Sequence, residues 1–100
     1  MDGDWEFLWF EPREFEWNHE KAESNRQKHG VSFEEATKVF AREILTQLQT
    51  HGGEERYAAI GFAGAKALVV VFTERQGRIR IISARKAAPS ERRWHGAHFL

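Results

Sequence analysis

The sequence predicts an α+β fold in which two N-terminal helices pack on a small antiparallel sheet and a short C-terminal helix follows. Three observations predict it: helix-capping residues before position 42, apolar and alternating runs separated by glycines between positions 44 and 81, and a helix start at Pro89. A chain of 100 residues, 41% of them hydrophobic, is the size of one compact domain.

The N-terminal segment is aromatic and acidic. Residues 5–10 favour a strand, which Pro12 ends. One face of that strand would hold three aromatic side chains, Trp5, Phe7 and Trp9. The residues Phe15-Glu16-Trp17 predict a second, brief extended segment.

The first predicted helix covers residues 19–29. Asn18 suits its N-cap, Glu20 suits its first turn, and Gly30 can end it in the left-handed conformation. The face expected to turn inward is largely polar and consists of Ala22, Asn25, Arg26 and His29. We therefore expect this helix to meet a polar group of the fold.

The second predicted helix covers residues 32–42. Ser32 and Glu35 form a capping-box pattern at its start. An apolar stripe at helical spacing predicts core packing and consists of Phe33, Ala36, Thr37 and Phe40, with Val39 alongside.

Four strands are predicted after this helix, at residues 44–50, 56–62, 67–74 and 78–81. Glycines mark the turns between them, at Gly52-Gly53, Gly64 and Gly77. Successive strands therefore pair as antiparallel hairpins. Residues 67–72 are apolar on both faces, which is typical of a central strand. The short terminal helix begins at Pro89.

The formal net charge of zero hides a division of charge along the chain. Residues 1–55 hold thirteen Asp and Glu against six Lys and Arg, whereas residues 75–100 hold seven Lys and Arg against Glu91 alone. Six of these seven cations are arginines, which favours bidentate contacts to phosphate. The C-terminal quarter is therefore a candidate polyanion-binding surface, and solvated surface charge is the competing interpretation.

Several classes of chemistry are disfavoured. The absence of cysteine excludes disulfides and thiol nucleophiles and suits a reducing cytoplasm. The five histidines show no metal-binding spacing, and no phosphate-binding glycine loop or serine triad pattern occurs. No apolar run could span a membrane, and residues 1–16 are too acidic for a leader. We expect a cytoplasmic protein without metal or cofactor, whose site consists of Arg, Glu, His and Lys.

The last predicted strand places two arginines on one face. Because side chains alternate along a strand, Arg78 and Arg80 share a face while Ile79 and Ile81 share the other. Elsewhere in the sheet, two charged residues end apolar rows, Arg56 and Glu74. Such a position indicates either a strand emerging into solvent or an active-site group at the edge of the core.

The ordered segments resemble the BrnT-type toxins over about residues 15–94. The resemblance rests on Phe15-Glu16-Trp17, on Lys28-His29-Gly30-Val31-Ser32-Phe33, on Gly53-Glu54-Glu55-Arg56-Tyr57, and on the segment from Arg78 to Arg85. Two departures are an aromatic, acidic extension over residues 1–14 and Ala41-Arg42-Glu43, where relatives often have an Asp-Pro turn. The resemblance implies that residues 15–100 form a single BrnT-like toxin domain.

The same resemblance implies a function. BrnT-type toxins belong to bacterial type II toxin–antitoxin systems and are small endoribonucleases with a RelE-like α+β fold. It implies inhibition of translation or growth, and neutralisation by a DNA-binding antitoxin of the BrnA kind. We expect an antitoxin dimer to unite two toxin chains.

Metal-free RNA cleavage by the 2′-hydroxyl needs a base, cations that stabilise the transition state, and an acid. By resemblance, the catalytic candidates are Arg80 as the transition-state clamp, Arg56, and the proton-transfer residues Glu74 and His29. The RNA-binding candidates are Arg78, Arg85, Arg92, Arg93, Tyr57 and Trp94. A helix C-terminus explains His29 almost as well, and core packing explains Tyr57 at least as well.

The competing function is a binding module that holds nucleic acid or an acidic protein segment on the same basic face without catalysis. We expect the arginines of this face to lack acidic partners within the chain: Arg78, Arg80, Arg85, Arg92 and Arg93. An antitoxin could then cover them with an acidic segment and exclude RNA.

Overall fold

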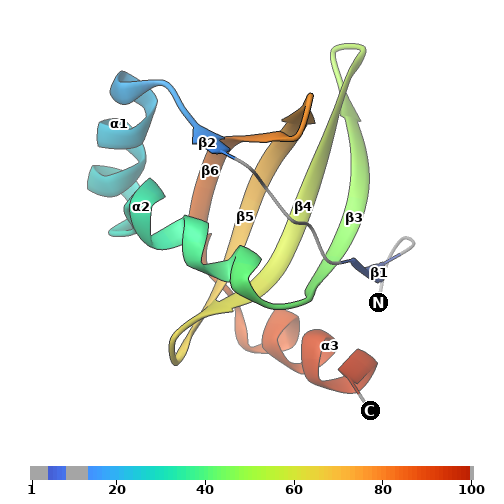
Figure 1. The fold of residues 1–100 in the computed structure, drawn as a ribbon. Coiled ribbons are helices and arrows are strands. Elements are labelled where there is room, and N and C mark those ends of the chain that lie inside the picture. The colour runs from blue at the N-terminus through green and yellow to red at the C-terminus, as the bar shows by residue number, and fades with distance from the viewer. Residues whose placement is uncertain (1–4, 9–13, 100) are drawn as a thin grey trace.

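A six-stranded mixed sheet dominates the computed structural model, which describes residues 5–8 and 14–99 (Figure 1). Four long strands form an antiparallel meander: β3 (Ile44–His51), β4 (Glu54–Ala63), β5 (Lys66–Arg75) and β6 (Arg78–Lys86). Two short strands lie at the edges, β1 (Glu6–Leu8) and β2 (Glu14–Glu16). The strand order is β1-β3-β4-β5-β6-β2, with β1 antiparallel to β3 and β2 parallel to β6.

The predicted fold class, two N-terminal helices on a small antiparallel sheet, was wrong. Two strands precede the helices, the sheet is large and mixed, and the helices are additions to it. The reason lies in the aromatic N-terminal segment, because Phe7 packs against the buried cluster beside β3 and Phe15 against the main core. Of the strand predicted over residues 5–10, Glu6–Leu8 is observed, whereas Trp9, Phe10 and Pro12 lie outside the described residues.

The helix α1 (His19–His29) has the predicted bounds. Asn18 Oδ1 accepts the Lys21 N–H at 3.0 Å, and Gly30 ends the helix with φ 71°. The polar group that α1 meets is the backbone of β6. The Asn25 side chain donates to the Ala84 carbonyl at 2.8 Å and accepts from the Ala84 N–H at 3.1 Å. Because β2 pairs only with the first part of β6, this amide takes the place of a neighbouring strand.

The second predicted helix is confirmed only in its first turn. The helix α2 (Phe33–Ala36) continues as the 3₁₀ helix η1 (Thr37–Ala41). The Thr37 hydroxyl donates to the Glu34 carbonyl at 2.7 Å, a local bond that competes with α-helical pairing. Ser32 caps the start as predicted, but the Glu35 carboxylate bonds Lys66 Nζ at 3.0 Å instead of completing a capping box.

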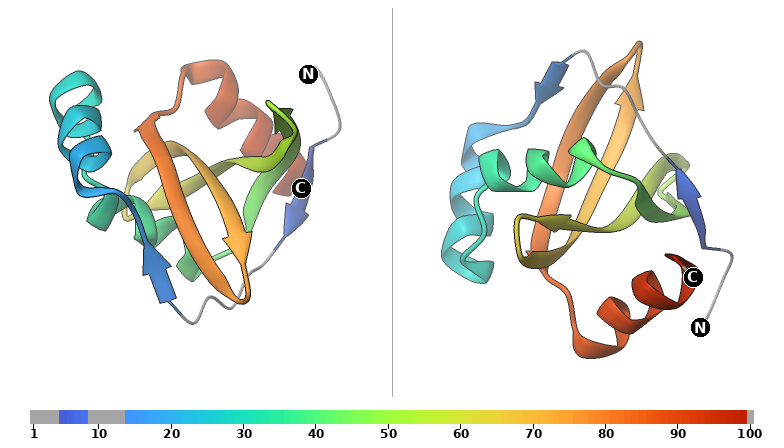
Figure 2. Two further views of the ribbon diagram at one scale, coloured as in Figure 1. Left: turned by 90° about the horizontal axis from the view of Figure 1, so that it is seen from above. Right: turned by 60° about the horizontal axis from the view of Figure 1, so that its bottom comes forward.

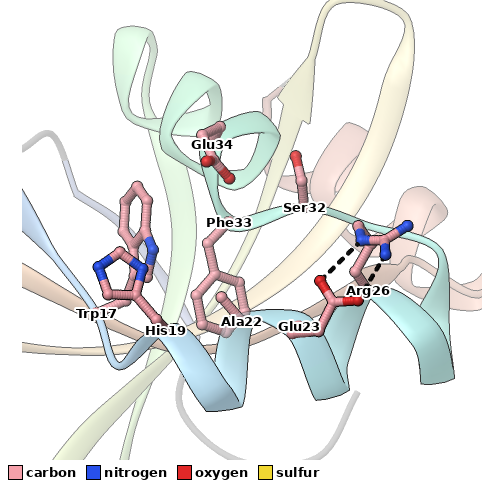
Figure 3. Close-up of a pocket in the computed structure, with 8 residues that line it drawn as sticks. All are labelled: Trp17, His19, Ala22, Glu23, Arg26, Ser32, Phe33 and Glu34. Atoms are coloured by element: carbon pink, nitrogen blue, oxygen red, sulfur yellow. Dashed lines mark hydrogen bonds and ion pairs between the residues drawn. The ribbon is translucent and has the colours of Figure 1, made fainter.

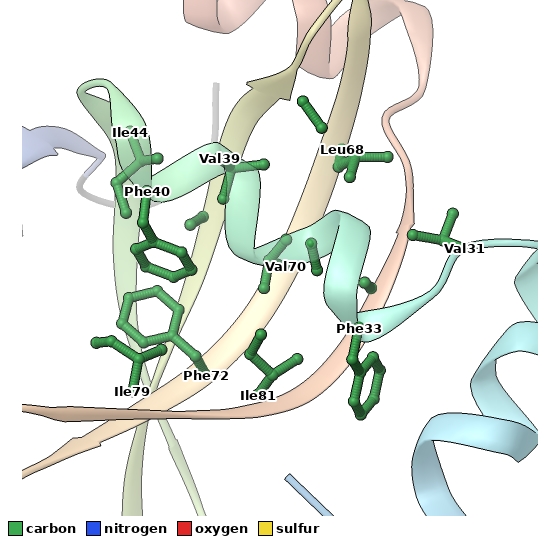
Figure 4. Close-up of a cluster of buried hydrophobic side chains, with 14 residues drawn as sticks. Val31, Phe33, Val39, Phe40, Ile44, Leu68, Val70, Phe72, Ile79 and Ile81 are labelled. Carbon is green, nitrogen blue, oxygen red and sulfur yellow. The ribbon is translucent and has the colours of Figure 1, made fainter. Parts of the chain in front are cut away.

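The main core lies between the sheet and the α2–η1 segment, which crosses one face of it (Figure 4). Both layers contribute side chains to it, among them Phe33, Val39, Phe40, Leu68, Val70 and Phe72. The approach is close at Gly61, where an added Cβ would come within 2.9 Å of the Val39 Cβ. A glycine at this position therefore allows η1 to lie against β4.

The helix α3 (Pro89–Phe99) is longer than the predicted short helix and covers one end of the opposite face (Figure 2). Trp94 packs there on a second buried cluster of Leu45, Ile60 and Val69. The rest of this face is not covered by a described helix. Within the described residues, no helix has the length and apolar character needed to cross a membrane.

Candidate functional site

A row of polar side chains crosses the sheet on the face opposite α2 and η1, which we call the open face. Gln49 pairs with Arg56, Thr73 pairs with Arg80, and Arg80 pairs with Glu16. Arg56 and Thr73 stand one residue beyond Tyr57–Phe72, the last pair of β4 with β5. Because directly paired residues share a face, five strands contribute to one row, which we call the arginine row: Gln49, Arg56, Thr73, Arg80 and Glu16.

The arginine row lies where the sheet divides into two hairpins. The pairing of β4 with β5 ends at Tyr57–Phe72, whereas β3–β4 and β5–β6 remain paired up to their turns. Arg56 belongs to the first hairpin and Arg80 to the second. Paired neighbouring strands are about 4.8 Å apart, so the two backbones are separated by at least about 10 Å, because β4 and β5 are no longer paired here. Two long guanidinium side chains can bridge that separation around a bound anion.

Arg56 and Arg80 both keep free donors. Arg80 Nη1 donates to Glu16 Oε2 at 3.1 Å, and Arg56 Nε donates to Glu54 Oε1 at a long 3.4 Å. Their other guanidinium nitrogens have no partner within the described part of the chain. The Arg56 side chain is 26% exposed and that of Arg80 is 36% exposed. Partial burial strengthens a contact to an anion, and the free nitrogens can make it.

The prediction of unpaired arginines was wrong for three of the five residues. Arg78 Nε lies 3.1 Å from Glu14 Oε2, and Arg80 and Arg85 also bind carboxylates. The reason is that β2, an acidic strand from the N-terminal segment, pairs beside the arginine strand β6. No ion pair involves Arg92 or Arg93 among the described residues.

Arg85 differs from Arg80 because both of its terminal nitrogens are occupied. Its two terminal nitrogens bind both oxygens of Glu91 in α3 at 2.8 Å, and Nη1 also donates to the Lys86 carbonyl. Glu91 accepts the Ala88 N–H at 2.7 Å, so the same carboxylate caps α3. The hydrogen bond from Arg85 lowers the pKa of Glu91, with help from the Ala88 N–H against the effect of burial. Arg85 therefore fastens α3 to the sheet.

Glu74 does not join the arginine row. It pairs with Ile79, a core residue, so its position belongs to the helix-covered face. Its carboxylate accepts the Gly77 N–H at 2.9 Å in the β5–β6 turn, where Gln76 has φ 54° and Gly77 has φ 81°. Such a turn is strained for Gln76, and the Glu74 bond stabilises it.

His29 lies at the end of α1 in a hollow of about 230 Å³ beside β6. The hollow is also lined by Lys21, Lys28 and Ser83. The structure therefore places His29 at the edge of β6 rather than in the arginine row.

The predicted base-stacking residues occupy two packed clusters. Tyr57 stacks on Phe72 with ring centroids 5.4 Å apart and packs against the main core. Trp94 packs against Trp5 with centroids 6.2 Å apart. Arg92 and Arg93 are exposed on α3, where both line a shallow hollow beside Phe62.

A separate hollow of about 230 Å³ lies between α1 and the start of α2 (Figure 3). Its walls combine Trp17, Ala22 and Phe33 with the Glu23–Arg26 ion pair at 2.6 Å. Because the positive charge of Arg26 is already paired with Glu23, this hollow is a weaker anion site than the arginine row. Among the described residues, no three His, Asp or Glu side chains gather where they could hold a metal ion.

Three members of the arginine row were not predicted from the sequence as site residues: Gln49, Thr73 and Glu16. Glu16 gave one usable signal, since the alternation Glu14-Phe15-Glu16 predicts two carboxylates on one face of an extended segment. The sequence did not indicate which strand this segment would join. Thr73 and Gln49 showed no pattern distinct from ordinary strand residues.

One family model matches the chain over residues 17–91. Its description is the ribonuclease toxin BrnT of type II toxin–antitoxin systems. The match includes Arg56, Thr73 and Arg80, whereas Glu16 lies immediately before it. No curated protein matches the chain.

Proposed function

The chain belongs to the BrnT family, the ribonuclease toxins of type II toxin–antitoxin systems, and on this premise we propose that it cleaves RNA on its open face without a metal ion. The reaction is attack of a 2′-hydroxyl on the adjacent phosphodiester, in the cytoplasm, with inhibition of translation or growth as its result. The observation that supports this proposal best is the pair of partly buried arginines, Arg56 and Arg80, in one row with free donors.

Arg80 is the proposed transition-state clamp. Negative charge builds on the phosphate oxygens as the 2′-oxygen attacks, and a fixed guanidinium stabilises that charge more than it stabilises the substrate. Arg56 binds the same phosphate or its neighbour from the other hairpin. Arg78, two residues from Arg80 on the same face, extends the positive surface along the RNA backbone.

The remaining sequence candidates have weaker geometric support. Arg92 and Arg93 are exposed and free to meet RNA, but they lie on α3, at the other end of the sheet from the hairpin turns beside the arginine row. Arg85 would have to release Glu91 before binding phosphate. Tyr57 and Trp94 would have to leave packed neighbours to stack on bases.

The test is a product analysis. Purified protein is incubated with single-stranded RNA in excess chelator, and the ends of the fragments are identified. The proposal predicts 2′,3′-cyclic phosphate and 5′-hydroxyl ends, with DNA and fully 2′-O-methylated RNA left intact. RNA that is bound but uncut would overturn the enzymatic proposal in favour of the binding module.

The family also implies an antitoxin partner, and we propose that a BrnA-like antitoxin covers the arginine row. Glu14 and Glu16 already bind Arg78 and Arg80, which indicates that an acidic protein segment fits this surface. Such an antitoxin would displace these carboxylates or add to them, and its dimer would unite two toxins into a DNA-binding complex.

The shared surface can be tested by charge reversal. Arg80→Glu with Arg85→Glu should weaken the binding of both RNA and antitoxin, whereas Arg26→Glu, in the hollow between α1 and α2, should weaken neither. Affinities are measured by titration after circular dichroism has shown that each variant is folded. Loss of RNA binding with unchanged antitoxin binding would contradict the shared surface.

A further inference from the structure

We propose that Glu16 accepts the 2′-hydroxyl proton in the RNA cleavage described above, an inference that rests on the proposed function. Neither of the proton-transfer candidates found in the sequence lies in the arginine row. Glu16 does, since it pairs with Arg80 in the β2–β6 register and its Oε2 lies 3.1 Å from Arg80 Nη1. Its side chain is 37% exposed, so a substrate can reach it.

The planar guanidinium of Arg80 can hold the Glu16 carboxylate and the substrate phosphate next to each other. Its Nη1 holds Glu16, while Nε and Nη2 have no partner among the described residues. A phosphate that binds Nε and Nη2 in bidentate fashion would therefore lie beside the Glu16 carboxylate, on adjacent donors of one rigid group. In RNA the 2′-hydroxyl is close to its own 3′-phosphate. This geometry brings the hydroxyl proton within reach of the carboxylate.

The proton balance of the step is simple. Glu16 takes the proton from the 2′-hydroxyl while the 2′-oxygen forms a bond to phosphorus and the bond from phosphorus to the 5′-oxygen breaks. The leaving 5′-oxygen takes a proton from water, and Glu16 then returns its proton to the solvent. The products are a 2′,3′-cyclic phosphate and a 5′-hydroxyl, with no net gain or loss of protons.

The other nearby carboxylates fit this role less well. Glu74 bonds the Gly77 N–H in the β5–β6 turn and belongs to the helix-covered face. Glu54 lies one row further out and holds Arg56 by a 3.4 Å contact. Glu14 lies one row further out on the other side, is 62% exposed, and pairs with Arg78.

Glu14 provides a matched control. It belongs to the same strand as Glu16, has the same parallel register, and binds the equivalent arginine two residues away. Glu16→Gln keeps the shape and a hydrogen-bond acceptor but cannot take a proton. We expect it to lower the cleavage rate constant about 100-fold or more, while Glu14→Gln changes it by about twofold or less.

Three further readouts separate proton transfer from a structural role. Binding to 2′-O-methylated RNA, measured by fluorescence anisotropy, should be unchanged or tighter in Glu16→Gln because a negative charge is removed. The loss of rate at low pH that reports a carboxylate should disappear in Glu16→Gln. The charged groups around it, Arg80 across the strand pair and Glu14 with Arg78 in the next row, remain in place. Glu16→Asp should restore part of the rate.

The outcomes are distinct. If Glu16→Gln cleaves like the wild type while Arg80→Ala does not, the role of Glu16 is overturned and the proposed function stands. If both Glu16→Gln and Glu14→Gln bind and cleave RNA better, these carboxylates mask the arginines, and the proposal is again overturned. If the wild-type protein cleaves no RNA, the proposed function itself fails. Reduced thermal stability of Glu16→Gln that accounts for its lost rate would also overturn the role.

Discussion

The two faces of the sheet are formed by alternate residues of the same strands, and they differ in what their side chains contact. On the helix-covered face, Val70 and Phe72 are fully buried against η1 and α2. On the open face, Thr73 and Arg80 lie in a polar row, in which Thr73 is buried and the Arg80 side chain is 36% exposed. Contact with the core and a place in the polar row thus alternate at each residue of a strand. Substitutions at neighbouring positions therefore test whether stability and chemistry are separated between the two faces.

The largest effect is expected from Phe72→Ala on the helix-covered face. Phe72 makes an edge-to-face contact with Phe40 at 4.9 Å and is fully buried. Its truncation should lower the free energy of unfolding by about 3–5 kcal/mol. Thr73→Val, on the adjacent residue of the open face, should change it by about 1 kcal/mol or less. Urea denaturation of the two variants measures both values, and similar losses would break the comparison.

A smaller loss is expected where α1 meets β6. Asn25→Ala removes three hydrogen bonds and leaves the Ala84 backbone groups without their partner. We expect the free energy of unfolding to fall by about 1–3 kcal/mol. Ser24→Ala, on the exposed neighbour, serves as the control with a change of about 0.5 kcal/mol or less. If Asn25→Ala left the free energy of unfolding unchanged, the Asn25 amide would not stabilise the edge of β6.

The smallest of these effects sharpens the contrast between Arg80 and Arg85. Glu91→Gln replaces the carboxylate that binds Arg85 and caps α3 with a neutral amide. The free energy of unfolding should fall by about 1–2 kcal/mol at neutral pH. Because Arg85 lowers the pKa of Glu91 in the folded state, this stability is fully present above the unfolded pKa of about 4.3. It is lost as the pH falls through the folded pKa.

The pH dependence gives the control for this prediction. The difference in unfolding free energy between the wild type and Glu91→Gln should shrink in acid. Thermal or urea unfolding at several pH values provides the measurement. A difference that stays constant down to acidic pH would contradict the assigned role of the Glu91 carboxylate.

The parts of the fold that local chemistry decides could be predicted from the sequence. Asn18, Gly30 and Ser32 end or begin helices through contacts within a few residues, and all three do so in the structure. The four long strands follow from alternation and glycine turns. The first three extend at most two residues beyond either predicted end, whereas β6 continues to Lys86, well beyond the predicted end at residue 81. The prediction of the second helix was wrong after its first turn, because a side-chain hydrogen bond of Thr37 competes with α-helical pairing.

The arrangement of the site could not be predicted, because it depends on pairing between distant segments. Phe15 pairs with Ile79, and no local pattern specifies that parallel partner. The sequence analysis therefore did not predict that Glu14 and Glu16 lie beside the arginines of β6. Glu74 was chosen because it ends an apolar row, and its bond to Gly77 gives that position a structural explanation.

The cleavage rate of Arg80→Ala tests most directly whether the open face performs the chemistry while the helix-covered face provides the stability. We expect RNA cleavage to fall about 100-fold or more, with an unfolding curve close to that of the wild type. Arg26→Ala removes an arginine of α1 that is also ion-paired but exposed, and it should leave the rate unchanged. Near-wild-type cleavage by Arg80→Ala would mean that the open face does not perform the chemistry through this arginine.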